Sequence, residues 1–118
     1  MGYRVADASD MELWQGAMRR VRRELGIRSF GINQVEVPPG WDNYPEHDET
    51  ETNHEELYLC LAGGGVVVVD GDEIEWRPGR YVLVEPESRR RIRAGSQGLT
   101  YVVIGAPADR DRGGWDDL

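Results

Sequence analysis

From residue 30 onward, short apolar runs alternate with clusters of glycine, proline and polar residues. Short runs rich in β-branched and aromatic residues, bounded by turn residues, are typical of strands. The pattern predicts strands over residues 30–37, 57–62, 66–70, 73–76, 81–84, 89–94 and 99–104. Turns are expected between them, with Gly63-Gly64-Gly65 as one turn and Asp70-Gly71 as a hairpin. Many short strands at regular spacing indicate an all-β sandwich or barrel.

A helical period appears before residue 30. Ser9 and Glu12 have the spacing of a capping box. Apolar residues then recur three or four positions apart, at Leu13, Ala17, Met18, Val21 and Leu25. Gly26 is a natural helix end. We therefore expect residues 1–29 to form an extension containing a short helix, ahead of a single β domain over residues 30–105.

Composition narrows the class of protein. A net charge of −8 argues against nucleic acid or an anionic membrane as a partner. The one cysteine, Cys60, lies in an apolar run and predicts a buried thiol without a disulfide. Without a signal-peptide pattern or a transmembrane-length apolar stretch, the expected location is cytoplasmic. The polar, Gly-rich residues 106–118 predict a loosely ordered tail, with Trp115 as its one candidate anchor.

Candidate chemistry is concentrated in residues 46–56. Both histidines of the chain, His47 and His54, lie there among six carboxylates, directly before an apolar run. Imidazole and carboxylate groups are the usual protein ligands of Zn, Mn, Fe and Ni. They also act as general acids and bases near neutral pH. Residues 46–56 therefore predict the location of a site for metal binding or for acid–base chemistry.

The strand that follows this window has two chemically different faces. Because side chains alternate along a strand, Glu56, Tyr58 and Cys60 share one face. The leucines at 57, 59 and 61 share the other face and need cover, either from the N-terminal helix or from a second subunit. We therefore expect a homodimer.

A run of arginines fills residues 89–93. Alternation places Arg89, Arg91 and Arg93 on one side, with Arg90 and Ile92 on the other. One interpretation is a charged, solvated edge strand. The other is that one arginine points inward, where it binds an anionic ligand or pairs with a carboxylate, because a buried arginine without such a partner is too costly.

Residues 40–104 resemble the small single-domain cupins. In the first motif, Gly40 precedes His47, and Glu56 precedes Gly63 by the spacing of that family. The second motif corresponds to Gly79, Pro86 and Arg91. The resemblance implies a double-stranded β-helix, that is, a jelly-roll barrel, with one interior pocket.

The resemblance also implies a site, and the substitutions in it leave two hypotheses open. Cupin metal sites use two histidines, a glutamate and a third histidine. Carried over by position, these are His47, Glu49, Glu56 and Arg91. In the first hypothesis His47, Glu49 and Glu56, with His54 as a further candidate, bind Mn, Fe, Zn or Ni beside a small polar or anionic molecule.

The second hypothesis has no metal. Arg91, which cannot ligate one, pairs with Glu49 or Glu56, and the pocket binds a small anionic molecule without catalysis. Aromatic walls are then expected from Tyr58, Tyr81 and Tyr101. Neither hypothesis names a reaction.

Overall fold

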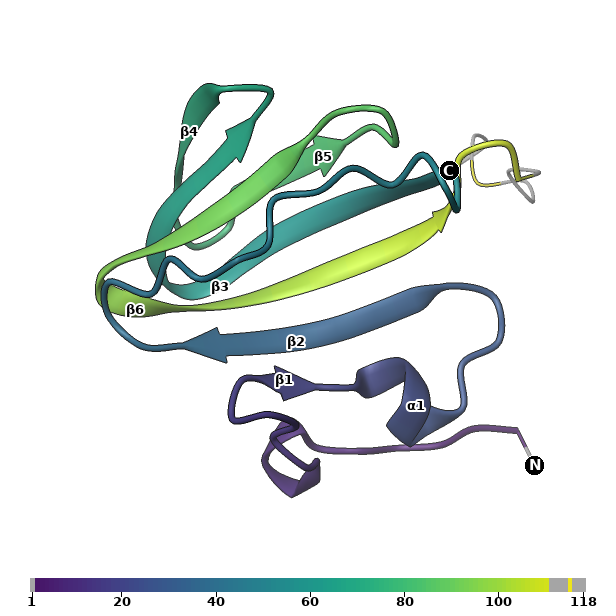
Figure 1. Ribbon diagram of the computed structural model, residues 1–118. Helices are drawn as coiled ribbons and strands as arrows, with labels where there is room; N and C mark the ends of the chain where they lie inside the picture. The colour runs from purple at the N-terminus through teal and green to yellow at the C-terminus, as the bar shows by residue number, and fades with distance from the viewer. Residues whose placement is uncertain (1, 111–114, 116–118) are drawn as a thin grey trace.

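The computed structural model describes residues 2–110 and 115, and its chain is mostly antiparallel β-sheet. Six strands pair in the order β1-β2-β6-β3-β4, and β5 pairs with β3 (Figure 1). The strands are β1 (Met18–Arg19), β2 (Gly31–Val37), β3 (His54–Val69), β4 (Asp72–Trp76), β5 (Tyr81–Val84) and β6 (Arg90–Pro107). The predicted all-β class is confirmed.

Two long strands build both layers of the molecule. The first half of β3 pairs with residues 101–107 of β6, and its second half, from Gly65, pairs with residues 90–94. The first halves form a layer with β2 and β5, and the second halves form a layer with β4. Side chains from both layers meet in one core, whose most buried members are Trp76, Tyr58, Ile92, Val67, Val84 and Cys60.

The expected turn at residues 63–65 is wrong. These glycines lie within β3, which passes through them with two register shifts, between Cys60 and Ala62 and between Gly63 and Gly65. Bulges of this kind bend a strand without ending it. The Asp70-Gly71 hairpin is confirmed, since Val69 pairs with Asp72 and both turn residues have positive φ, as a type I′ turn requires.

The predicted N-terminal helix is largely wrong. The structure has a 3-10 turn at Ala8–Asp10, then β1, then α1 at Val21–Leu25. Gln15 and Gly16 both have positive φ and form the turn of a small hairpin in which Trp14 and Met18 pair. A helix cannot pass through that backbone. Of the expected helix signals, only Gly26 keeps its role, as the left-handed C-cap of α1.

The expected leucine face is confirmed on the outside of β3. Leu57 and Leu59 are half-buried, and Leu61 is 45% exposed. The neighbouring strand β5 adds Leu83 and Tyr81, which pair with Leu57 and Leu59 and are exposed by 57% and 63%. Tyr81 therefore lies on the outer face and not in a pocket wall. No described part of the chain buries this outer face.

The C-terminal prediction is only partly within the described residues. Strand β6 continues to Pro107, and Trp115 is 75% exposed. Residues 111–114 and 116–118 lie outside the described part. Among the described residues, no helix has the length and apolar character needed to cross a membrane.

Candidate functional site

The loop between β2 and β3 carries two of the predicted site residues. It runs lengthwise across the molecule from the end of β2 to the start of β3 (Figure 1). Its backbone is tied to the opposite layer, because His47 N–H donates to the carbonyl of Arg90 at 3.3 Å and Arg90 N–H donates back at 2.9 Å. Glu49 N–H donates to the carbonyl of Pro86 at 2.8 Å. These bonds hold His47 and Glu49 above β3.

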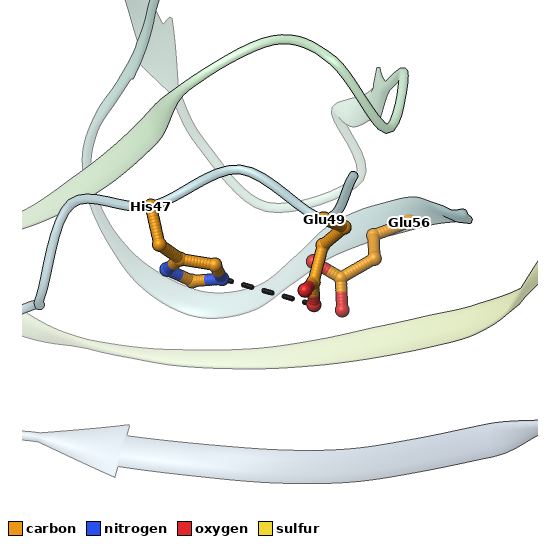
Figure 2. A group of neighbouring side chains, drawn as sticks. All are labelled: His47, Glu49 and Glu56. Atoms are coloured by element: carbon orange, nitrogen blue, oxygen red, sulfur yellow. Dashed lines mark ion pairs between the residues drawn. The ribbon is translucent and has the colours of Figure 1, made fainter. Parts of the chain in front are cut away.

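His47, Glu49 and Glu56 converge on one point (Figure 2). Each offers one ligand atom, and these atoms all lie within 4.8 Å of one another. The His47 Nε2 to Glu49 Oε1 distance is 3.8 Å. All three side chains are half-buried. One metal ion with bonds of about 2.0–2.2 Å could therefore contact all three after small side-chain movements.

The imidazole of His47 is held in the tautomer that a metal requires. Its Nδ1 lies 2.8 Å from the carbonyl oxygen of Pro45. A carbonyl only accepts hydrogen bonds, so Nδ1 carries the proton and the neutral ring leaves a lone pair on Nε2. The ring of Tyr44 stacks on His47 with 5.5 Å between centroids and fixes its plane.

Two tyrosines orient Glu56. The hydroxyl of Tyr58 donates to Glu56 Oε1 at 2.7 Å and lies 3.0 Å from the hydroxyl of Tyr44. Because Tyr58 has one proton and gives it to Glu56, Tyr44 must donate to Tyr58. Burial raises the pKa of Tyr44 to about 12 and raises the pKa of Tyr58 further. Both hydroxyls therefore stay protonated at neutral pH, and Oε2 of Glu56 is left for a metal.

The inward arginine is Arg90, and the placement of Arg91 in the pocket is wrong. Arg90 is completely buried, as is Ile92 on the same side of β6. Arg91 faces the outer side, where it lines a groove with Glu46, Glu73 and Arg93. The predicted alternation of the arginines is confirmed, but the motif spacing indicates the wrong arginine as the inward one. The apolar Ile92 was the available signal, because the face that carries it must be the core face.

Arg90 is incompletely paired. Its NH2 donates to the carbonyl of Glu85 at 3.0 Å, but Nε and NH1 have no hydrogen-bond partner. NH1 lies 3.7 Å from Glu56 Oε1, close enough for an ion pair but too long for a hydrogen bond. A permanent positive charge thus lies in the interior beside the metal-ligand candidates.

A cavity of about 450 Å³ adjoins His47. Its walls come from the N-terminal hairpin, the β2–β3 loop and the inner faces of β2 and β6. They include Trp14, Val35, Trp41, Tyr44 and Tyr101, together with His47. Tyr101 thus occupies the expected wall position, whereas Tyr58 lies behind the wall and supports Glu56. Sequence reasoning missed Trp14, Trp41 and Tyr44, which carry no periodic signal within their irregular segments.

His54 is apart from the cluster. It is the first residue of β3, where it pairs with Pro107, on the same strand face as Glu56. The group of mutually close ligand atoms among the described residues does not include it.

The donor set suits a divalent transition metal. One imidazole nitrogen and two carboxylate oxygens match the preferences of Mn, Fe, Zn and Ni. Two carboxylates and Arg90 leave the site with a net charge of about −1, which attracts a cation. Three protein ligands leave coordination positions open for a small molecule.

Two of three comparisons place the chain among known proteins. A family model for the cupin domain matches residues 33–105. No curated protein sequence matches. Many solved structures are similar, among them a cupin protein from Bacteroides fragilis, at 22% identity with a TM-score of 0.82, covering 96% of this chain and 91% of that one.

Two of the similar structures with functional descriptions differ in the activity named. One is a sugar phosphate isomerase of the cupin superfamily from Silicibacter pomeroyi, at 18% identity and TM-score 0.74, covering 89% of this chain and 76% of that one. The other is a predicted oxalate decarboxylase from Thermotoga maritima, at 16% identity and TM-score 0.71, covering 88% and 99%. At these identities the likeness shows the fold alone.

Proposed function

Because the chain belongs to the cupin family, we propose that His47, Glu49 and Glu56 bind one divalent metal ion, with a small polar or anionic molecule as the partner of that site. The observation that carries this proposal is the convergence of one imidazole and two carboxylates within 4.8 Å, two of them from the loop and one from β3. The two described neighbours, named for a sugar phosphate and for oxalate, support an anionic molecule.

The chain's own residues would prepare the site in three ways: they fix the tautomer of His47, fix the rotamer of Glu56 and exclude water. Pro45 fixes the tautomer of His47, and Tyr58 fixes the rotamer of Glu56. When bound, the metal would act as a Lewis acid that polarises an oxygen of the small molecule. The adjoining cavity would shield that oxygen from water, which strengthens electrostatic interactions. Whether a reaction follows depends on the molecule bound.

The metal-free hypothesis keeps one observation in its favour. Arg90, rather than Arg91, lies 3.7 Å from Glu56 in the interior and could neutralise that carboxylate without a metal. The pocket would then be a binding module without catalysis.

Elemental analysis of protein purified without chelator separates these functions. We expect near-stoichiometric Mn, Fe, Zn or Ni, and we expect His47→Ala to lose it because the site then retains two protein ligands. His54→Ala is the matched control, because it removes the other histidine of the chain and should retain the metal. Metal-free wild-type protein after incubation with excess metal would exclude the metal site, and equal loss in both variants would contradict the assignment of His47 alone.

We propose that the partner of the outer leucine face is a second copy of this chain. The face is apolar and exposed at Leu61, Leu83 and Tyr81, and exposed apolar patches of this kind mark interaction sites. Light scattering after gel filtration should give twice the 13.4 kDa chain mass. Leu83→Glu should return the monomer, whereas Val5→Glu, at an exposed apolar residue far along the chain, should remain a dimer. A monomeric wild type would contradict this proposal.

The single cysteine supports a reducing compartment for this protein. Cys60 is buried, and burial raises the pKa of its thiol, so it behaves as a core side chain. We therefore propose a cytoplasmic location.

A further inference from the structure

The cavity beside His47 has mostly apolar walls. Trp14, Trp41 and Tyr101 contribute aromatic walls, and Val35 contributes an aliphatic one. The volume of about 450 Å³ exceeds the roughly 150 Å³ that holds a benzene ring in an engineered protein cavity. The walls and the volume therefore suit a ring or a branched aliphatic group.

The same cavity has no cation in its walls. Among the described lining residues there is no arginine, lysine, aspartate or glutamate, and the polar side-chain groups are those of Gln15 and His47, the tyrosine hydroxyls and the tryptophan indole N–H groups. Phosphate groups are usually held by arginine, lysine or clustered backbone N–H groups. A sugar phosphate would leave its phosphate and hydroxyls against indole and aliphatic surfaces, where unpaired polar groups are costly.

The net charge of the metal end of the site favours a ligand whose head group carries one negative charge. Glu49 and Glu56 contribute −2, the buried Arg90 contributes +1, and a divalent ion contributes +2. The sum is about +1, and Arg90 NH1 and Nε have no hydrogen-bond partner. A singly charged head group at the metal would bring the site to neutrality, which is the cheapest state for a half-buried site.

His47 joins these two environments. It belongs to the metal-ligand group and also lines the cavity. Tyr44, which stacks on it, lines the cavity as well and reaches Glu56 through Tyr58. A molecule coordinated on the cavity side of His47 would therefore extend along the aromatic walls.

We infer that this site takes a monocarboxylic acid with an apolar, ring-sized body, the carboxylate at the metal and the body in the cavity. This inference rests on the proposed metal site. It differs from the sugar phosphate and oxalate for which the two neighbours are named, because neither of those has an apolar body.

Benzoate is the first probe, titrated into the metal-loaded 118-residue chain by calorimetry and tryptophan fluorescence. Benzamide keeps the ring and removes the charge, acetate keeps the charge and removes the ring, and glucose 6-phosphate supplies the competing chemistry. We expect benzoate to bind about tenfold tighter than benzamide, since one ion-pair interaction is lost. We also expect it to bind about tenfold tighter than acetate, since a buried ring is lost.

Variants of Arg90 test the charge argument. Arg90→Met should weaken benzoate binding about tenfold while retaining the metal, because removing the positive charge favours the cation and disfavours the anion. Arg90→Lys preserves the charge and should preserve benzoate binding. This variant tests the charge argument if Arg90→Met fails to fold. Arg91→Met, on the outer face of the same strand, is the matched control and should change neither property.

Variants of two tryptophans test whether the apolar body of the ligand lies in the cavity. Trp41→Leu should weaken benzoate but not acetate, whereas Trp115→Leu, at an exposed tryptophan outside the cavity walls, should weaken neither.

The possible outcomes distinguish a failure of this inference from a failure of the proposed metal-binding function on which it rests. Metal binding together with the expected order of probes supports both. Metal binding with benzoate no tighter than benzamide, acetate or glucose 6-phosphate overturns the inference alone. Absence of metal in elemental analysis overturns the proposed function and this inference with it.

Discussion

Gly65→Ala is expected to lower the free energy of unfolding by about 3 kcal/mol, because the added methyl group would collide with backbone. A Cβ at Gly65 would lie 2.0 Å from the carbonyl oxygen of Arg93. That oxygen belongs to β6, and Gly65 begins the second half of β3, where the strand has just passed its bend. Neither strand can move away without breaking the pairing that joins the two layers.

Gly31→Ala is the matched control for this prediction. A Cβ at Gly31 would lie 3.7 Å from the carbonyl oxygen of Gly105, an ordinary contact, and the residue does not have positive φ. Its effect on the free energy of unfolding should stay within about 1 kcal/mol. Urea unfolding followed by circular dichroism measures both variants. Equal stabilities of Gly65→Ala and the control would show that the close approach of β3 and β6 is not required.

Glu56→Ala should lower the free energy of unfolding by about 3–5 kcal/mol, the usual cost of leaving a buried charge without its partner. The remaining charge is that of Arg90, which is completely buried and has Glu56 as its ion-pair partner at 3.7 Å. The variant also removes the acceptor of the Tyr58 hydroxyl. The same substitution should abolish metal binding, because a carboxylate ligand is lost.

A double substitution distinguishes this cause from a loss of packing. Glu56→Ala with Arg90→Met removes both charges and should recover part of the lost stability, since no unpaired charge remains. Glu55→Ala, at the exposed neighbour on the opposite face of β3, should change the stability little. Additive effects of the two single substitutions would contradict an interaction between Glu56 and Arg90.

Local patterns in the sequence predicted three of the six strands, whereas β3 and β6 were each expected as two shorter strands and β1 as part of a helix. The expected boundaries of β5 are those observed, and β2 and β4 differ from expectation by one residue. The alternation of Glu56, Tyr58 and Cys60 with the leucines of β3 is also as expected. These successes share a cause, because side-chain alternation and turn chemistry are properties of a few neighbouring residues.

The candidate site was predicted in part. The motif spacing identified His47, Glu49 and Glu56 as a set, and the structure brings them together. The same spacing selected Arg91, whereas the structure buries Arg90. A shift of one residue in a strand reverses the face of every side chain, so a gap of slightly different length is enough to cause this error.

Contacts between distant segments account for what sequence reasoning missed. Residues 13–25 have helical spacing, yet Met18 and Arg19 pair with β2, whose residues lie 15 to 17 positions further along the chain. The pattern of glycines at 63–65 predicts a turn because the close approach of β6 to Gly63 and Gly65, and of β4 to Gly64, is not visible locally.

The strands, their faces and the ligand types of the site follow from the order of residues along the chain, because each depends on short-range geometry. The bend of β3, the burial of Arg90 beside Glu56 and the aromatic cavity depend on segments 21 to 87 residues apart. Their positions are set by which chain segments can share one core, and only the folded chain decides that.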